Sequence, residues 1–282
     1  MRNNINKNDI RKQYWQEQME QGLEFFNKVI EFPIDECGED LVYLPEVLET
    51  DKLSVNYSDT ETVPGMKRLF YLREGLIPRF QAMVKEFNRQ KLILKIEDAY
   101  RNLEMQKQLA LKDSILKKVI DLVYWETGNN SADLALIIKR LKVLVACCPA
   151  TATHMSGSAL DISILDKETG KEIDRGGPYL ELSALTPMDS PFISAEARKN
   201  RHLISSIMNR YDFTAYPYEF WHYSSDDVLA GTTLRSYEYA RYGPIDFDPT
   251  TGKIKQTSDP GRMLNTDSEI LKKIKSILKS KY

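Results

Sequence analysis

The chain has 282 residues, of which 42% are hydrophobic and 28% charged, and its formal net charge is −2. This composition is typical of a soluble globular protein with one large or two small domains, and it excludes a disordered or fibrous chain. The nearly balanced charge gives no electrostatic reason to expect nucleic acid or an anionic membrane as a partner.

The sequence pattern also argues against membrane insertion and secretion. The best apolar run, at 143–150, is much shorter than the roughly 18 residues that a membrane span needs. Residues 1–18 lack the apolar core of a secretory signal. Cys147 and Cys148 are adjacent, and neighbouring cysteines rarely pair, so we expect these two and Cys37 to be buried thiols in a reducing compartment. We therefore expect a cytoplasmic protein.

Hydrophobic periodicity predicts mostly helices in the first half of the chain. The amphipathic segment 8–31 is expected to be a helix that packs on the main body. The further helices expected here lie at 73–89, 102–125 and 131–141, the last with Ser131 as its N-cap, and the expected strands lie at 41–44 and 91–98.

The pattern changes to shorter periods in the second half. Residues 142–148 are predicted to form a buried strand. In a second strand, 159–165, Asp161 and Ser163 alternate with apolar residues and so face the other side. The remaining predicted elements are a turn at 166–171, a helix at 194–211 capped by Ser194, a strand at 219–225, and a helix at 266–280 that opens with a Thr266/Glu269 capping box. Because strands and helices mix without regular alternation, we predict an α+β fold with a central, largely antiparallel sheet flanked by helices.

The three histidines are few enough for their positions to be informative. His202 lies inside a predicted helix with no acid arranged around it, which favours a surface or packing role. His154 and His222 each lie at the edge of a predicted strand, and each has a carboxylate close in sequence, Asp161 and Glu219.

Two imidazoles and one aspartate would supply the three protein ligands that a catalytic zinc typically has. Gly157 would allow a sharp bend between His154 and Asp161. Glu219 could then remain unligated and take a proton from the zinc-bound water, provided that it lies in the turn before its strand. Spacing alone leaves the alternative open that His154 and His222 are core histidines beside aromatic residues.

Several motifs together resemble one enzyme family. The segment "HMSGSALD" at 154–161 resembles the His-x-x-Gly-x-Ala-x-Asp motif of the D-alanyl-D-alanine dipeptidases and carboxypeptidases, and "EFWH" at 219–222 resembles their Glu-x-Trp-His motif. The segment "EDAYRNLEMQ" at 97–106 is similar to their Asp-Gly-Tyr-Arg-Pro segment. The resemblance is to the vancomycin-resistance type of bacterial zinc dipeptidase and covers roughly residues 65–245.

This resemblance implies a role for each matching residue. His154, Asp161 and His222 would hold one Zn²⁺ per chain in a cleft on the sheet of a hedgehog/D,D-peptidase-like fold, and Glu219 would be the catalytic base. Arg101 would polarise the scissile carbonyl and stabilise the oxyanion. The substrate-binding candidates are Glu181, near the position of an acid that receives the substrate's ammonium group, and Thr153, beside Ala152, which replaces a family serine.

The expected function is therefore zinc-dependent hydrolysis of a small D-amino-acid dipeptide, most simply D-Ala-D-Ala. The alternatives are a D,D-carboxypeptidase or another peptidoglycan-peptide hydrolase, and a zinc-containing binding module without catalysis. We expect an N-terminal extension at 1–64 packed on the main domain, a catalytic domain at 65–245, and a C-terminal extension at 246–282 ending in an amphipathic helix. The sequence leaves the oligomeric state open.

Overall fold

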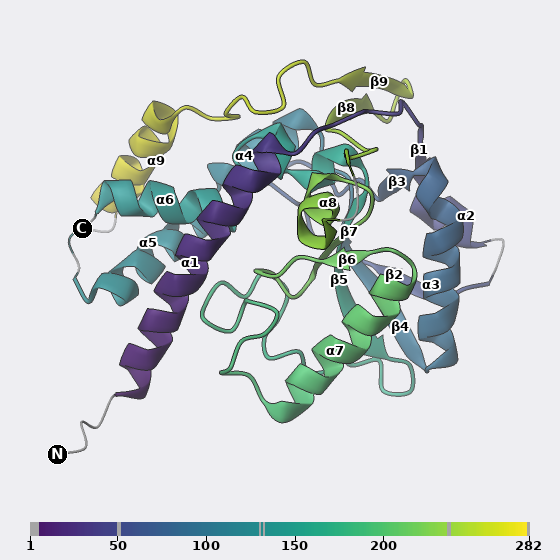
Figure 1. Ribbon diagram of the computed structural model, residues 1–282, viewed down its shortest axis with the longest axis horizontal. Helices are drawn as coiled ribbons and strands as arrows, with labels where there is room; N and C mark the ends of the chain where they lie inside the picture. The colour runs from purple at the N-terminus through teal and green to yellow at the C-terminus, as the bar shows by residue number, and fades with distance from the viewer. Residues whose placement is uncertain (1–5, 50–51, 130, 132, 236–237, 281–282) are drawn as a thin grey trace.

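The computed structural model describes residues 6–49, 52–129, 131, 133–235 and 238–280 (Figure 1). Its centre is a five-stranded sheet in the order β2-β4-β5-β7-β6, in which only the β2–β4 pair is parallel. The strands are β2 (Val55–Tyr57), β4 (Leu92–Asp98), β5 (Ala159–Asp166), β6 (Thr214–Ala215) and β7 (His222–Ser224). The prediction of an α+β fold with a largely antiparallel sheet is confirmed.

One face of the sheet is apolar and is covered by two helices, α3 (Ile77–Arg89) and α7 (Ala195–Arg210). Leu160, Ile162 and Ile164 of β5 point into this core, as the alternation of the strand predicts. Asp161 and Ser163 therefore point to the opposite face, where both are buried. Because a buried carboxylate needs hydrogen-bonding or charged partners, polar side chains are expected next to Asp161 on that face.

A second core lies in the helical layer formed by α1 (Lys7–Glu31), α5 (Asp113–Thr127), α6 (Leu134–Leu144) and α9 (Asp267–Ser280). Figure 1 shows α1 running along this layer. Trp15, Met19 and Phe26 of α1 are buried in it, so the N-terminal helix packs on the body of the protein as expected. Thr266 and Glu269 form the predicted capping box at the start of α9.

The other elements connect or extend these layers. They are β1 (Leu41–Tyr43), α2 (Leu44–Glu49), β3 (Tyr71–Arg73), η1 (Glu74–Leu76), α4 (Leu103–Ala110), η2 (Pro149–Thr151), η3 (Thr153–Ser156), α8 (Val228–Leu234), β8 (Ile245–Asp248) and β9 (Lys253–Gln256). Among the described residues, no helix combines the length and the apolar character needed to cross a membrane.

The prediction of one helix over 102–125 is wrong, because the chain breaks between α4 and α5. Lys112 adopts an extended conformation there, and its ammonium group donates to the carbonyl of Thr62 at 3.0 Å. This contact with a distant segment redirects the chain, and hydrophobic periodicity does not record it.

The predicted strand at 142–148 is also wrong. Helix α6 continues to Leu144, since Ile137, Leu141 and Leu144 share its buried face, and the chain is irregular beyond it. Asp133, whose carboxylate accepts from the Leu136 amide, caps this helix in place of Ser131. Residue 132 of the predicted helix lies outside the described residues.

Two smaller expectations also need correction. The strand predicted at 219–225 contains only His222–Ser224, because the preceding residues form turns. The three cysteines are free thiols, but only Cys148 is buried; Cys147 is partly buried and Cys37 is exposed.

Candidate active site

Three backbone segments bring His154, Asp161 and His222 together on the polar face of the sheet. Asp161 of β5 pairs directly with His222 of β7, and a register shift in β4 between Ile96 and Asp98 places Asp98 opposite Asp161 on the other side. His154 reaches the same point from η3. All four residues, His154, Asp161, His222 and Asp98, are at most 5% exposed.

Gly157 makes the approach of His154 possible. It ends η3 with a φ of +69°, a left-handed conformation that favours glycine. A Cβ atom at this position would lie 2.4 Å from Cδ2 of Leu41, so space as well as conformation excludes a side chain. The bend that the sequence predicts between His154 and Asp161 is therefore present.

The donor atoms of the three residues face one another. Oδ1 of Asp161 lies 3.2 Å from Nε2 of His154 and 3.0 Å from Nδ1 of His222, and the three ligand atoms lie within 4.8 Å of one another. Metal–ligand bonds of about 2.0–2.2 Å in a tetrahedral site separate neighbouring ligand atoms by roughly 3.3 Å. The spacing therefore fits a small divalent cation.

The hydrogen bonds on the far sides of the rings also suit metal ligation. Nδ1 of His154 lies 2.5 Å from the carbonyl oxygen of Ala99, which can only accept, so this nitrogen carries the proton and Nε2 presents its lone pair. Nε2 of His222 contacts the hydroxyl of Thr153 at 3.0 Å, which leaves Nδ1 facing the site. Such outer contacts fix the orientation of imidazole ligands.

The electrostatics favour the ligating forms of Asp161 and His222. Burial alone would raise the pKa of Asp161, but His154 and His222 outweigh this and hold that pKa well below its usual range. Burial lowers the pKa of His222, which favours the neutral imidazole. An ionised carboxylate and neutral imidazole nitrogens are a donor set suited to Zn²⁺.

Glu219 lies beside this cluster in the turn between β6 and β7, as its proposed role requires. The turn is closed by hydrogen bonds from the Glu219 amide to the Tyr216 carbonyl, at 3.4 Å, and from the His222 amide to the Glu219 carbonyl, at 3.2 Å. The Glu219 side chain is partly exposed and lines the cavity. Burial, followed by the charge of Asp161, raises the pKa of Glu219 to about 8, so its carboxyl is poised to exchange a proton near neutral pH.

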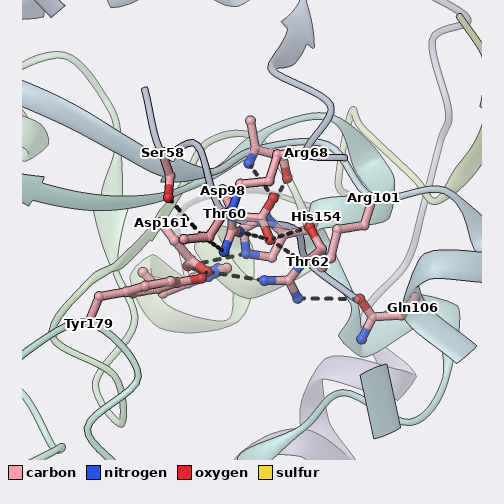
Figure 2. Close-up of polar contacts among 12 residues, drawn as sticks. Ser58, Thr60, Thr62, Arg68, Asp98, Arg101, Gln106, His154, Asp161 and Tyr179 are labelled. Carbon is pink, nitrogen blue, oxygen red and sulfur yellow. Dashed lines mark hydrogen bonds and ion pairs between the residues drawn. The ribbon is translucent and has the colours of Figure 1, made fainter. Parts of the chain in front are cut away.

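Arg101 is held against the site by two carboxylates (Figure 2). Its Nε donates to Asp98 at 2.9 Å and one terminal nitrogen, Nη2, donates to Asp161 at 3.1 Å. The remaining nitrogen, Nη1, has only a 3.4 Å contact with Gln106. Asp98 and Asp161 outweigh the effect of burial and raise the pKa of Arg101, so its charge is permanent. Within the described part of the chain, these contacts use three of the five guanidinium hydrogens, and Arg101 lines the cavity.

Sequence reasoning assigned no role to three polar neighbours that Figure 2 shows in contact with the site. The Asp98 carboxylate forms ion pairs with Arg101 and with Arg68, the second at 2.8 Å. The Tyr179 hydroxyl donates to Oδ2 of Asp161 at 2.9 Å. Asp98 stands in the quoted segment "EDAYR", but its role depends on the register shift, and nothing in the sequence around Tyr179 indicates its partner.

The two predicted substrate-binding residues lie in different surroundings. Thr153 lines the cavity, but its hydroxyl is engaged by His222. Glu181 is partly buried in the loop that carries Tyr179, and it is not among the residues lining the cavity, although Leu180 and Leu182 are. The structure thus brings together His154, Asp161, His222, Glu219 and Arg101, together with Thr153, but does not place Glu181 among them.

The site opens into a cavity of about 420 Å³. Besides His154, Asp161, His222, Glu219 and Arg101, its polar lining includes Arg68, Asp98, Lys112, Thr153 and Tyr179. Two histidines and an aspartate that could hold a metal ion thus share one cavity with a separate glutamate that could exchange a proton.

A family model described as D-ala-D-ala dipeptidase matches residues 93–240, about half of the chain, and the chain belongs to that family. All five clustered residues fall inside the matched range.

Curated relatives agree with this assignment over shorter segments. A D-alanyl-D-alanine dipeptidase of Synechocystis sp. is 33% identical over 88 residues, which is 27% of this chain and 35% of the relative. A D-alanyl-D-alanine dipeptidase of Enterococcus faecium is 31% identical over 72 residues, 26% of this chain and 36% of the relative. The matched segments thus span about a third of each relative's length.

The similar solved structures are distant. They include the vancomycin-resistance D,D-pentapeptidase VanY in complex with Zn(II), with 16% identity, a TM-score of 0.35 and coverage of 64% of this chain and 85% of that one. The LdcB LD-carboxypeptidase has 18% identity, a TM-score of 0.36 and coverage of 73% of this chain and 76% of that one.

Proposed function

We propose that this protein is a zinc-dependent dipeptidase that hydrolyses a small D-amino-acid dipeptide such as D-Ala-D-Ala. The observation that carries the proposal is the convergence of the ligand atoms of His154, Asp161 and His222 beside a glutamate outside that set, Glu219, in one cavity. Membership of the D-ala-D-ala dipeptidase family supports it.

His154, Asp161 and His222 would hold the metal. When bound, Zn²⁺ would polarise a carbonyl oxygen and lower the pKa of water near it. The contacts of His154 with the Ala99 carbonyl and of His222 with Thr153 would keep both rings in the ligating orientation. We accordingly assign Thr153 to the support of His222 rather than to direct substrate binding.

Glu219 would move the proton. As a carboxylate it would take a proton from the attacking water, and as a carboxylic acid it would deliver that proton to the leaving amine nitrogen. Without metal, burial and the charge of Asp161 raise the pKa of this carboxyl, whereas a bound cation beside it would favour the carboxylate that accepts the first proton.

Arg101 would stabilise the negative charge that develops on the carbonyl oxygen. Its guanidinium is fixed by Asp98 and Asp161, so it needs no reorganisation during the reaction. Its Nη1, the least engaged nitrogen, is the donor available for the substrate. Glu181 has no part in this proposal, because it does not line the cavity.

Zinc analysis combined with a D-Ala-D-Ala hydrolysis assay tests the proposal. We expect one zinc per chain and hydrolysis that chelation removes and added zinc restores. His154→Ala and His222→Ala should lose both zinc and activity, whereas His202→Ala, at the exposed third histidine, should keep both. A D,D-carboxypeptidase would instead prefer a pentapeptide stem to the free dipeptide, and a binding module would hold zinc without hydrolysing either.

A further inference from the structure

The cavity that contains the polar site is also lined by apolar side chains. Four of its lining residues, each at most 7% exposed, form what we call the apolar subsite. They are Phe26 of α1, Val143 of α6, Leu229 of α8, and Tyr216, which lies between β6 and β7. These side chains come from separate parts of the chain, yet they border the same space as His222 and Glu219. A cavity that reaches such buried apolar residues can desolvate an apolar group of a ligand.

The apolar subsite begins immediately beside the candidate metal ligands. The ring of Tyr216 lies 5.9 Å from the imidazole of His222, centroid to centroid, and the ring of Phe26 lies 5.9 Å from that of Tyr216. The neighbouring Phe25 also packs on Tyr216 at 5.9 Å, but it does not line the cavity. Phe26 is thus separated from the candidate metal ligand His222 by a single ring, that of Tyr216.

The cavity is larger than alanyl-alanine requires. That dipeptide has about 11 non-hydrogen atoms, so even a full water's share of roughly 30 Å³ for each atom would leave part of the 420 Å³ unfilled. Cavities of roughly 300–1,000 Å³ commonly hold ligands of drug size. The volume left over has room for a substrate side chain larger than a methyl group.

We propose that the apolar subsite takes a bulky aliphatic or aromatic side chain of a D,D-dipeptide, and that Phe26 sets its size limit. This inference rests on the proposed dipeptidase function and specifies its substrate class. Phe26 lies outside residues 93–240, so the N-terminal helix contributes a specificity wall that the family match does not include.

The experiment compares D-Ala-D-Ala with D-dipeptides that carry leucine or phenylalanine at either position, using the zinc-loaded protein. We expect at least one position at which the bulkier residue raises kcat/KM about tenfold or more, since each additional methylene in an apolar pocket is worth roughly that factor. Calorimetric Kd values on the zinc-loaded Glu219→Gln variant should show the same preference without turnover.

Matched variants test the role of Phe26. Phe26→Leu opens the wall and should shift the preference toward phenylalanine over alanine at least threefold, whereas Phe25→Leu, one residue away on the same helix, should leave the preference unchanged. Equal shifts in both variants would indicate loosened packing and would overturn the role of Phe26.

The two proposals fail in different ways. Efficient hydrolysis of D-Ala-D-Ala with weaker binding and slower turnover of every bulkier dipeptide would overturn the apolar subsite and leave the dipeptidase function intact. Absence of both hydrolysis and binding for all of the dipeptides would overturn both.

Discussion

Replacing Glu219 with glutamine should stabilise the metal-free protein at alkaline pH, although it should abolish turnover. The pKa of this carboxyl rises from 4.5 to about 8 on folding, mainly because of burial. The folded state therefore retains the proton above pH 4.5, whereas the unfolded state releases it. Stability falls as the pH rises between these two values, and the full penalty is present above the folded pKa. Glutamine carries no such penalty.

The size of the effect follows from the two pKa values. Each pH unit between 4.5 and about 8 contributes 1.36 kcal/mol, so the upper limit is about 5 kcal/mol. Because the side chain keeps some exposure to the cavity, we expect a smaller gain of roughly 1–3 kcal/mol from Glu219→Gln.

Urea unfolding of the chelated wild type and variant measures this gain at two pH values. The difference in unfolding free energy should be close to zero near pH 4 and reach its plateau near pH 9. Other groups titrate equally in both proteins and cancel. A difference that does not change with pH would refute the burial of an ionisable Glu219.

Three further substitutions test other parts of the account. Gly157→Ala should cost about 2–4 kcal/mol in urea unfolding, because a positive φ and a 2.4 Å contact both oppose the new Cβ, and it should weaken zinc binding. Arg140 of α6 and Glu126 of α5 form a buried ion pair at 2.5 Å, so Arg140→Met, which leaves the Glu126 carboxylate without that partner, should cost about 3–5 kcal/mol in the same measurement. Arg101→Lys keeps the positive charge but loses the planar guanidinium, which donates to both Asp98 and Asp161. We therefore expect kcat/KM to fall about 100-fold while zinc content is retained.

Each substitution has a control in the same chain. Gly170 has a similar positive φ of 68°, but a Cβ there would meet no atom within 4 Å, so Gly170→Ala should cost only about 1 kcal/mol. Lys139→Met, beside Arg140 but more exposed, should change stability by less than about 0.5 kcal/mol. Arg89→Lys, at a largely exposed arginine, should leave kcat/KM unchanged. Equal effects in test and control variants would contradict the corresponding assignment.

The parts of the site that the sequence predicts depend on local pattern. Alternation along β5 places Asp161 on the polar face, and the two motifs contain His154, in η3 shortly before β5, and His222, the first residue of the adjacent β7. The placement of Glu219 in a turn also follows from local features, since Pro217 interrupts the strand before it. Hydrophobic alternation and turn-forming residues act over only a few positions, so these features can be predicted from a single sequence.

The parts that the sequence does not predict depend on contacts between distant segments. The register shift after Ile96 aligns Asp98 with Asp161, and no local pattern indicates it. The chain breaks at Lys112 because of its contact with Thr62, and Tyr179 reaches Asp161 from a loop. The strand predicted at 142–148 failed because a short apolar run fits a buried helix end equally well.

The metal content of the purified protein, measured together with its hydrolysis of D-Ala-D-Ala, tests the central claim most directly. The account predicts one zinc per chain held by His154, Asp161 and His222, and dipeptide hydrolysis that disappears on chelation and returns with zinc. A protein that binds no zinc, and hydrolyses no D-Ala-D-Ala when zinc is added, would contradict it.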